Sequence, residues 1–250
     1  MIVAALFGLV IGSFLNVCIY RLPRGESVAW PASRCTSCKR SLAWYENVPV
    51  VSWAVLGGRC RTCKARVSAV YPVIELSTGI LFAAAYSWYG PTPLGIVRTL
   101  FGCALVVLFV IDLQHRILPN VITVPGTLIG LVLSLFLPPG WVSSLIGVAV
   151  GGGMLFGIAE TYYRIRGIQG LGMGDVKMLA MIGAFLGWQL ALVTLILASF
   201  GGALLGVALI VTKRGGMQAA LPFGTFLAVA AAIAAVAGDR LVTWYLSYYQ

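Results

Sequence analysis

Long apolar runs dominate this sequence and limit what it can fold into. Of its 250 residues, 60% are hydrophobic and only 10% are charged, and the mean hydropathy is +0.97. A soluble domain carries about 25% charged residues. A chain this apolar has too much surface to hide from water to stay disordered. We therefore exclude both classes and predict an all-α, polytopic membrane helix bundle.

Charged residues and Gly/Pro clusters divide the apolar sequence into segments close to the roughly 20 residues that a helix needs to cross a bilayer. Eight membrane-spanning helices are predicted. The sixth is short for a full crossing, and the Gly-rich segment 167–175 before it indicates that this helix starts inside the membrane or is tilted. The predicted spans are 2–20, 68–89, 95–112, 121–137, 141–160, 176–188, 190–211 and 221–237.

The 17 basic residues are distributed unevenly about these spans. All but Arg98 and Arg240 fall on one side, which includes the segment 21–67 and, near the other end of the chain, Lys213 and Arg214. Under the positive-inside rule this side is cytoplasmic, and both termini are predicted to be outside. The net charge of +10 is then explained by topology and contact with anionic lipid headgroups, so no nucleic-acid partner is expected.

The same reasoning predicts three parts of the chain. Residues 1–20 form a first transmembrane helix, residues 21–67 form a cytoplasmic loop, and residues 68–250 form a transmembrane bundle. No Lys or Arg precedes the first apolar run. We therefore expect the first helix to be a retained anchor rather than a cleaved signal peptide.

Four cysteines lie in the predicted cytoplasmic loop as two C-x-x-C pairs, separated by 21 residues. Two such pairs typically close a tetrahedral Cys₄ site for Zn²⁺. The reducing cytoplasm disfavours stable disulfides, although a disulfide and a redox pair stay open as alternatives. A closed Cys₄ site has no free coordination position, so the predicted zinc is structural and holds together a loop too small for its own core. The predicted ligands are Cys35, Cys38, Cys60 and Cys63.

Carboxylates inside a membrane are costly, about 2.5–3.5 kcal/mol each, and therefore invite functional hypotheses. Asp112 ends the third predicted span and Asp175 precedes the sixth, so both are expected at the cytoplasmic boundary at similar depth. Two carboxylates that share a site can act as general acid and general base on a peptide bond. In the structural alternative, Asp112 caps its helix or pairs with Arg116, and Asp175 is the N-cap beside Lys177.

Two glycines precede the second of these carboxylates. Gly172 and Gly174 leave no side chains beside Asp175, and glycine permits dihedral angles that other residues resist. We therefore expect an extended peptide to approach the backbone there. A G-x-G-D motif is weak when taken alone.

In combination, these residues resemble a family. Gly172-Met-Gly174-Asp175, preceded by the segment from Asp112 to Pro119-Asn120, is similar to the prepilin leader peptidases, which are membrane aspartic proteases. The N-terminal motifs resemble those of the bifunctional bacterial members, and the likeness covers roughly residues 8–227. Pro222-Phe-Gly224 resembles the family's P-F-G-P segment, but Thr225 stands where proline is expected. The N-terminal motifs are Gly12-Ser-Phe-Leu-Asn16-Val17, Arg21-Leu-Pro23, the two C-x-x-C pairs and Tyr71-Pro-Val-Ile-Glu75.

The resemblance implies an enzyme of the bacterial inner membrane with its active site toward the cytoplasm. Such enzymes cut the basic leader from type IV prepilins and type II pseudopilins after a glycine, then methylate the new N-terminal amine with S-adenosylmethionine. It implies that Asp112 and Asp175 are catalytic and that the four cysteines bind the metal. Archaeal relatives lack the cysteine loop and do not methylate, so the loop favours a bifunctional enzyme.

The methyl-donor site has no dinucleotide-type signature, because Gly151-Gly-Gly153 lies inside an apolar span and predicts close helix packing instead. We expect a membrane-embedded or loop-lined cleft. Asn16 and Glu75 are candidates to bind the substrate amine or the cofactor, with hydrogen bonding between helices as the alternative.

Other residues are candidates for binding the peptide. They are Gly172, Gly174 and Lys177, and His115 and Lys177 could also contact the carboxylate pair. A basic leader is repelled by a basic loop, so recognition is expected to use the hydrophobic helical part of the substrate.

Three other functions stay open at this point. The first is a monofunctional peptidase in which the cysteine loop is only a scaffold. The second is a proton-coupled transporter in which Asp112 and Asp175 relay protons; the sequence has no apparent pair of repeated half-bundles to support it. The third is a quinone-linked thiol oxidoreductase that uses the C-x-x-C pairs, which the predicted cytoplasmic placement disfavours.

Overall fold

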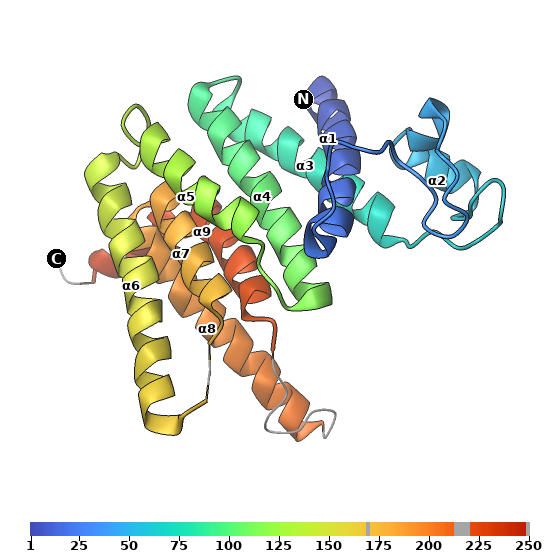
Figure 1. The fold of residues 1–250 in the computed structure, drawn as a ribbon. Helices are drawn as coiled ribbons and strands as arrows, with labels where there is room; N and C mark the ends of the chain where they lie inside the picture. Colours follow the sequence, from blue (N-terminus) through green and yellow to red (C-terminus); the bar gives the residue numbers. More distant parts are fainter. Residues whose placement is uncertain (169–170, 213–220, 249–250) are drawn as a thin grey trace. The chain divides into compact units, whose positions relative to one another are not determined.

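The computed structural model describes residues 1–168, 171–212 and 221–248. Within these ranges the long elements are all helices, and isolated bridges take the place of strands. The prediction of an all-α protein is confirmed. The helices (Figure 1) are α1 (Ile2–Arg21), α2 (Val51–Val55), α3 (Val70–Tyr89), α4 (Pro93–His115), α5 (Asn120–Leu133), α6 (Trp141–Arg166), α7 (Met173–Leu186), α8 (Trp188–Val211) and α9 (Phe223–Leu246).

Each of the eight predicted spans corresponds to one of these helices, but the count of eight full crossings is not confirmed. In the described ranges, six helices are long and apolar enough to cross a bilayer: α1, α3, α4, α6, α8 and α9. Helices α5 and α7 have 14 residues each. They are therefore about 21 Å long, whereas the hydrocarbon core is about 30 Å thick. Lys213 and Arg214 lie outside the described residues.

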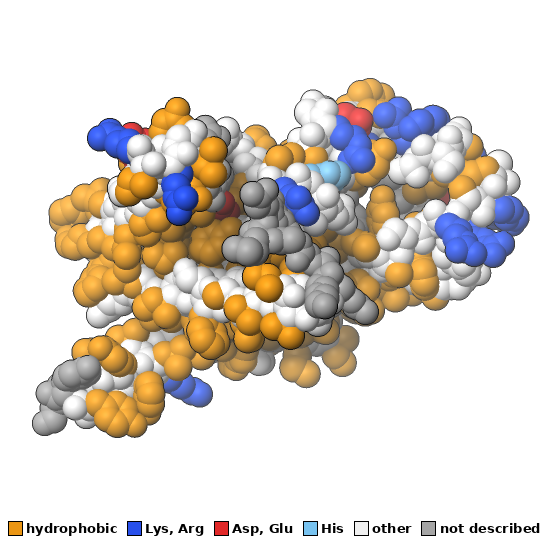
Figure 2. Space-filling model, turned by 90° about the horizontal axis from the view of Figure 1, so that it is seen from below, with side chains coloured by type: hydrophobic (Ala, Val, Ile, Leu, Met, Phe, Trp, Pro, Cys, Tyr) orange, Lys and Arg blue, Asp and Glu red, His pale blue; other side chains and the backbone are white. Residues whose placement is uncertain are grey.

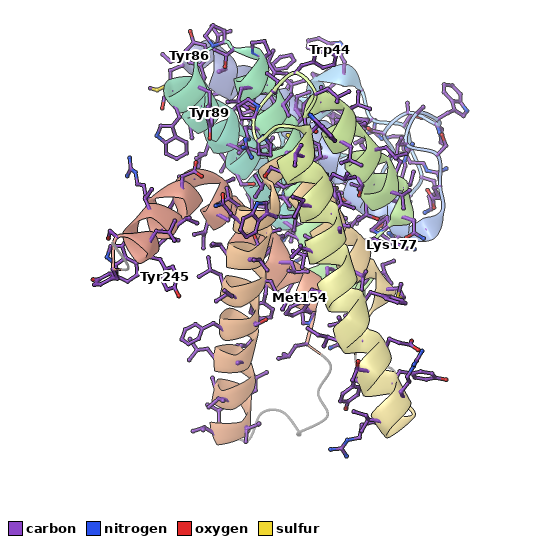
Figure 3. All side chains as sticks on the ribbon, turned by 90° about the vertical axis from the view of Figure 1, so that its left-hand side faces the viewer. Trp44, Tyr86, Tyr89, Met154, Lys177 and Tyr245 are labelled. Atoms are coloured by element: carbon purple, nitrogen blue, oxygen red, sulfur yellow. The ribbon has the colours of Figure 1, made fainter. Side chains whose placement is uncertain are left out.

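Large apolar side chains cover the outer surface of the helices. On α8, for example, Phe200 is 71% exposed and Ile196 is 67% exposed, and Figure 2 shows hydrophobic side chains over much of the visible face. Tyr86 and Tyr89 lie near the end of α3 and Tyr245 near the end of α9 (Figure 3). Tyrosines are common at membrane interfaces. These features are those of a multi-pass membrane protein.

The chain forms two compact units, Met1–Val107 and Leu108–Gln250, which divide within α4. In the first unit α1 packs against α3. A Cβ atom added to Gly12 would lie 2.7 Å from the Cα atom of Glu75, so this contact needs a glycine. The loop between the two helices contains α2 and two short 3₁₀ helices, Leu22–Arg24 and Trp44–Asn47. The predicted three-part division at residues 20 and 67 stays a prediction.

In the second unit, α7 packs against α5, α6, α8 and α9. The contact with α6 is very close, because a Cβ atom on Gly183 would lie 2.2 Å from the carbonyl oxygen of Gly147. Gly151 and Gly152 also face α7, whereas an added Cβ on Gly153 would meet open space. Close helix packing was the prediction for this glycine run, and it is confirmed for two of the three glycines.

Candidate active site and metal centre

The two predicted carboxylates lie in the second unit, at the ends of neighbouring structural elements. Asp112 is in the last turn of α4 and Asp175 is in the first turn of α7. Their exposed fractions are only 4% and 9%, and the two charges are close enough to interact. Helix α7 begins at Met173 with Gly172 as its N-cap. The alternative that Asp175 is itself the N-cap is therefore wrong.

The carboxylate of Asp112 is held by the start of α9. The backbone N–H of Thr225 donates to Oδ2 of Asp112 at 2.7 Å, and the Thr225 hydroxyl lies 3.0 Å from the same oxygen. A Cβ atom on Gly224 would lie 3.1 Å from this carboxylate. The sequence analysis noted Thr225 only as a departure from the family's proline and did not predict this contact.

The glycines before Asp175 leave space for its carboxylate rather than adopt special dihedral angles. Gly172 has φ −75° and ψ 136°, which any residue can adopt, and Gly174 is inside the helix. A Cβ atom on Gly172 would lie 3.1 Å from Oδ2 of Asp175, and one on Gly174 would lie 3.0 Å from Cβ of Leu118. The expectation that these glycines are needed for unusual dihedral angles is wrong.

Two basic residues proposed to contact the pair have other surroundings. The ammonium group of Lys177 (labelled in Figure 3) donates to Oδ1 of Asn120 at 2.9 Å and so links the starts of α7 and α5. His115 is exposed at the end of α4. Neither observation puts Lys177 or His115 in contact with Asp112 or Asp175.

The four cysteines form a compact cluster in the first unit. Their Sγ atoms all lie within 4.8 Å of one another, and those of Cys35 and Cys63 are 3.8 Å apart. Four sulfurs at a Zn–S distance of about 2.3 Å form a tetrahedron with edges of about 3.8 Å. The donor set and its spacing therefore fit a tetrahedral metal ion such as Zn²⁺.

The backbone around the cysteines repeats the same turn twice. The N–H of Lys39 donates to the carbonyl of Cys35 and the N–H of Lys64 to that of Cys60, both at 3.0 Å. Lys39 and Lys64 have positive φ values of 60° and 56°. The backbone N–H groups of Cys63 and then Thr62 lower the pKa of Cys60 to about 6, because they stabilise its thiolate. Each turn thus presents a pair of thiols, and the second turn favours the thiolate form of Cys60, the form that binds metal.

An ion pair stabilises the loop beside the cluster. One guanidinium nitrogen of Arg40 lies 2.7 and 2.9 Å from the two carboxylate oxygens of Glu46, which also accepts the N–H of Ala43. The bonds from Arg40 and Ala43 lower the pKa of Glu46. Trp53 donates its indole N–H to the carbonyl of Val67 at 3.1 Å.

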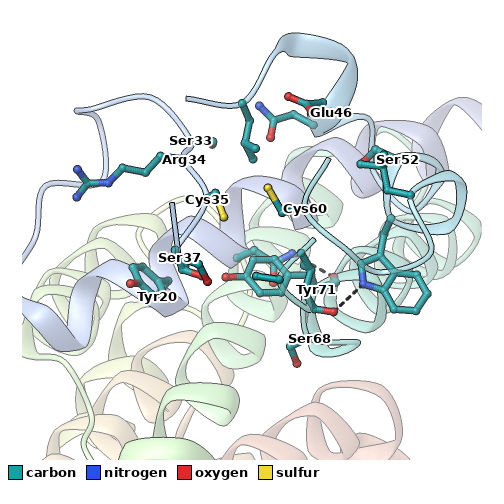
Figure 4. A pocket seen from close by; sticks show the side chains of 18 of the residues that line it. Tyr20, Ser33, Arg34, Cys35, Ser37, Glu46, Ser52, Cys60, Ser68 and Tyr71 are labelled. Carbon is teal, nitrogen blue, oxygen red and sulfur yellow. Dashed lines mark hydrogen bonds between the residues drawn. The ribbon is translucent and has the colours of Figure 1, made fainter. Parts of the chain in front are cut away.

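A pocket of about 440 Å³ opens beside the cysteines in the first unit (Figure 4). Asn16 and Glu75, the two candidates for the methyl-transfer site, both line it. Asn16 donates to the carbonyl of Tyr71 at 3.1 Å, and Glu75 accepts the N–H of Val50 at 2.7 Å. Both residues therefore also tie elements together, as the alternative interpretation expected. The sequence reasoning missed the aromatic lining residues Tyr20, Trp53 and Tyr71.

Comparisons with known proteins agree with this arrangement. The bacterial peptidase A24 N-terminal domain matches residues 6–89, and the type IV leader peptidase family matches residues 99–207. The chain is 36% identical to a prepilin leader peptidase/N-methyltransferase of Aeromonas hydrophila, over 98% of this chain and 93% of the relative. The chain belongs to the bacterial type IV leader peptidase family.

Other members of the family show similar agreement. The enzyme of the same name from Pseudomonas putida is 35% identical over 95% of this chain and 91% of its own length. That of Myxococcus xanthus is 42% identical over 84% of this chain and 63% of its own. No solved structure matches the chain.

Proposed function

We propose that this chain is an aspartic endopeptidase that removes leader peptides from type IV prepilins or type II pseudopilins and then N-methylates the new N-terminal residue. The observation that carries the proposal is the pair of buried carboxylates from α4 and α7, in a chain of this family. The relatives described above carry both activities in their name. A proton-coupled transporter or a thiol oxidoreductase has no such support.

In the proposed reaction, Asp112 and Asp175 activate one water molecule against the carbonyl carbon of the scissile peptide. One carboxylate accepts a proton from the water, and the other, protonated, donates to the carbonyl oxygen. The absence of side chains at Gly172 and Gly174 leaves room for the carboxylate of Asp175 and the side chain of Leu118. The apolar surfaces of the helices suit the hydrophobic helical part of a prepilin.

For the second activity, we propose that the pocket in the first unit binds S-adenosylmethionine and the substrate amine. The cofactor supplies an electrophilic methyl group when bound. The Glu75 carboxylate would attract a cationic ligand, and the aromatic rings of Tyr20, Trp53 and Tyr71 suit a sulfonium or an adenine ring. Pockets of about 300–1,000 Å³ are typical for ligands of this size. We assign Zn²⁺ to Cys35, Cys38, Cys60 and Cys63 as a structural ion beside this pocket.

We also propose that the enzyme lies in the bacterial inner membrane with its active site toward the cytoplasm. Arg116 directly follows the end of α4, and the last turn of α6 carries Arg164 and Arg166. Lys177 lies near the start of α7. The positive-inside rule assigns such basic ends to the cytoplasm.

The test is a cleavage and mass assay on a purified prepilin with and without S-adenosylmethionine. Asp112→Asn and Asp175→Asn should each reduce cleavage by at least about 10³-fold, because each removes one of the two proton-transfer groups. Asp239→Asn, which removes an exposed acidic group on α9, is the matched control and should cleave normally. Full cleavage by either active-site variant contradicts the assigned pair. A cleaved product that never gains the methyl mass contradicts the second activity.

A further inference from the structure

Two donors from one residue converge on a single oxygen of Asp112. The backbone N–H and the hydroxyl group of Thr225 lie 2.7 and 3.0 Å from Oδ2. Thr225 is 8% exposed and Asp112 is 4% exposed, so both residues are buried. A buried carboxylate oxygen with two hydrogen-bond partners has a fixed orientation and is shielded from water.

The backbone N–H can only donate, so Oδ2 is an acceptor and does not carry a proton. The hydroxyl group, which shares this oxygen, then donates as well. Proton transfer by Asp112 is left to its other oxygen, Oδ1. Hydrogen bonds from two donors stabilise the charged form of a carboxylate over the neutral form.

The charged groups near Asp112 also favour its ionised form over that of Asp175. Arg116, which directly follows α4, interacts favourably with its negative charge, and Asp175 on α7 interacts with it unfavourably. The favourable neighbour of the Asp175 carboxylate is the backbone of Gly172. Since two adjacent carboxylates share a proton, the proton is expected on the member with the weaker stabilisation, Asp175.

We propose that Thr225 is a positioning residue that keeps Asp112 ionised, so that Asp112 is the base that activates water and Asp175 is the acid. This proposal rests on the proposed peptidase function. It concerns a position where this chain departs from the family's P-F-G-P segment. A proline at position 225 would have neither the N–H nor the hydroxyl group that contacts Oδ2.

The assigned roles give a balanced reaction. The water oxygen bonds to the carbonyl carbon while one water proton moves to Oδ1 of Asp112 and the proton of Asp175 moves to the carbonyl oxygen. In the resulting diol, the C–N bond breaks, the proton on Asp112 moves to the leaving nitrogen, and one diol proton returns to Asp175. The products are an acid and an amine, and the pair regains its starting protonation.

The test is the pH dependence of kcat/KM for prepilin cleavage in Thr225→Val, Thr225→Ser and Thr225→Pro. Thr225→Val retains the N–H and loses the hydroxyl group, so the acidic limb of the profile should move to higher pH by about one unit. Thr225→Pro loses both donors and should move the acidic limb to a still higher pH. Thr225→Ser retains both and should leave it unchanged. The change should lie in kcat, with KM for the prepilin altered less than about twofold.

Thr194→Val is the matched control. Thr194 is fully buried on α8, and its hydroxyl group donates to the carbonyl of Leu190 at 2.7 Å. It should lose stability without any change in the pH profile. Thr225→Ala serves as a second variant without the hydroxyl group if Thr225→Val does not fold.

An active Thr225→Val or Thr225→Ala enzyme with a wild-type acidic limb overturns the role of Thr225. This outcome is distinct from failure of the proposed function, which would appear as cleavage by Asp112→Asn or Asp175→Asn. An acidic limb that moves equally in Thr194→Val would also overturn the proposal, because the movement would then reflect general destabilisation.

Discussion

The two units hold their polar residues in place by different means. In the first unit, Asn16 and Glu75 face a pocket whose other side is a loop with two short 3₁₀ helices, the five-residue α2 and four clustered cysteines. In the second, Asp112 and Asp175 are buried at the ends of packed helices, with glycines at the points of closest contact. The first site therefore depends on cross-links within a loop, and the second on the steric fit between helices. A substitution that disrupts one site should therefore leave the activity of the other site largely intact.

The largest effect is expected from Gly183→Ala, because it would introduce a steric clash between two packed helices of the second unit. The new Cβ atom would lie 2.2 Å from the carbonyl oxygen of Gly147, and neither backbone can rotate away. We expect a loss of at least about 3 kcal/mol of stability and of nearly all cleavage. Thermal unfolding in detergent and a prepilin cleavage assay measure the two effects.

Gly153→Ala is the control, since a Cβ atom there meets open space on the same helix pair. It should retain normal stability and cleavage. A stable, active Gly183→Ala protein would show that α6 and α7 do not need this close contact.

The next effect concerns the cysteine cluster of the first unit. Cys60→Ser, or removal of the metal by a chelator, should reduce methyl transfer at least about tenfold, because the loop that forms one wall of the pocket loses its cross-link. Cleavage should change less than about threefold. Metal analysis, methyl incorporation and cleavage are measured on the same preparation.

Cys103→Ser is a suitable comparison, because Cys103 is buried on α4 in the same unit but outside the cluster. It should retain the metal. Equal loss of cleavage and methyl transfer in Cys60→Ser would contradict the idea that the two sites fail separately. Absence of zinc from protein purified under reducing conditions would contradict the Cys₄ assignment.

A smaller and more local effect is expected for Glu75→Gln, which removes one charge from the pocket. The amide oxygen of glutamine can still accept the N–H of Val50, so the loop should stay attached to α3. Methyl transfer should fall about 10-fold, with a raised KM for S-adenosylmethionine and normal cleavage.

Glu26→Gln is the control, because Glu26 also lines the pocket but is more exposed and pairs with Arg34 only at 4.0 Å. It should have little effect. Equal effects of the two substitutions would indicate that net charge matters in the pocket rather than the position of Glu75.

The smallest effect is expected for Lys177→Met, which removes the exposed hydrogen bond to Asn120. Stability should fall by about 0.5–1 kcal/mol, and cleavage should change less than about threefold. A large loss in kcat would instead give Lys177 a direct part in the reaction.

The sequence was most informative where a pattern extended over many residues. Apolar runs predicted each of the long helices, since lipid-facing helices must be apolar along their whole length. Two C-x-x-C pairs predicted the cysteine cluster, because the metal requires that spacing. Asp112 and Asp175 were identified because an acidic residue is conspicuous in an apolar context.

Features that depend on contacts between distant residues could not be predicted in this way. The hydrogen bonds from Thr225 to Asp112 join residues 113 positions apart, and the backbone N–H involved leaves no mark in the sequence. The short helix α2 has only five residues in a brief apolar run, too short for its periodicity to distinguish a helix from a strand. The sequence singled out Gly172 and Gly174 for a substrate-binding role that stays a prediction, and only the structure identifies space for neighbouring side chains as a reason for glycine there.

The short length of α5 has a consequence for the surrounding lipid. At about 21 Å, this helix cannot match a hydrocarbon layer of about 30 Å, and it exposes apolar side chains such as Val121 and Leu128, so the bilayer beside it must thin or the headgroups must dip toward its end. Its first residue, Asn120, accepts a hydrogen bond from Lys177 near the start of α7, where Asp175 also lies. A peptidase must bring water to a substrate embedded in lipid. Hydrophobic mismatch at a shortened helix offers a way to hydrate the peptide bond without a channel through the protein.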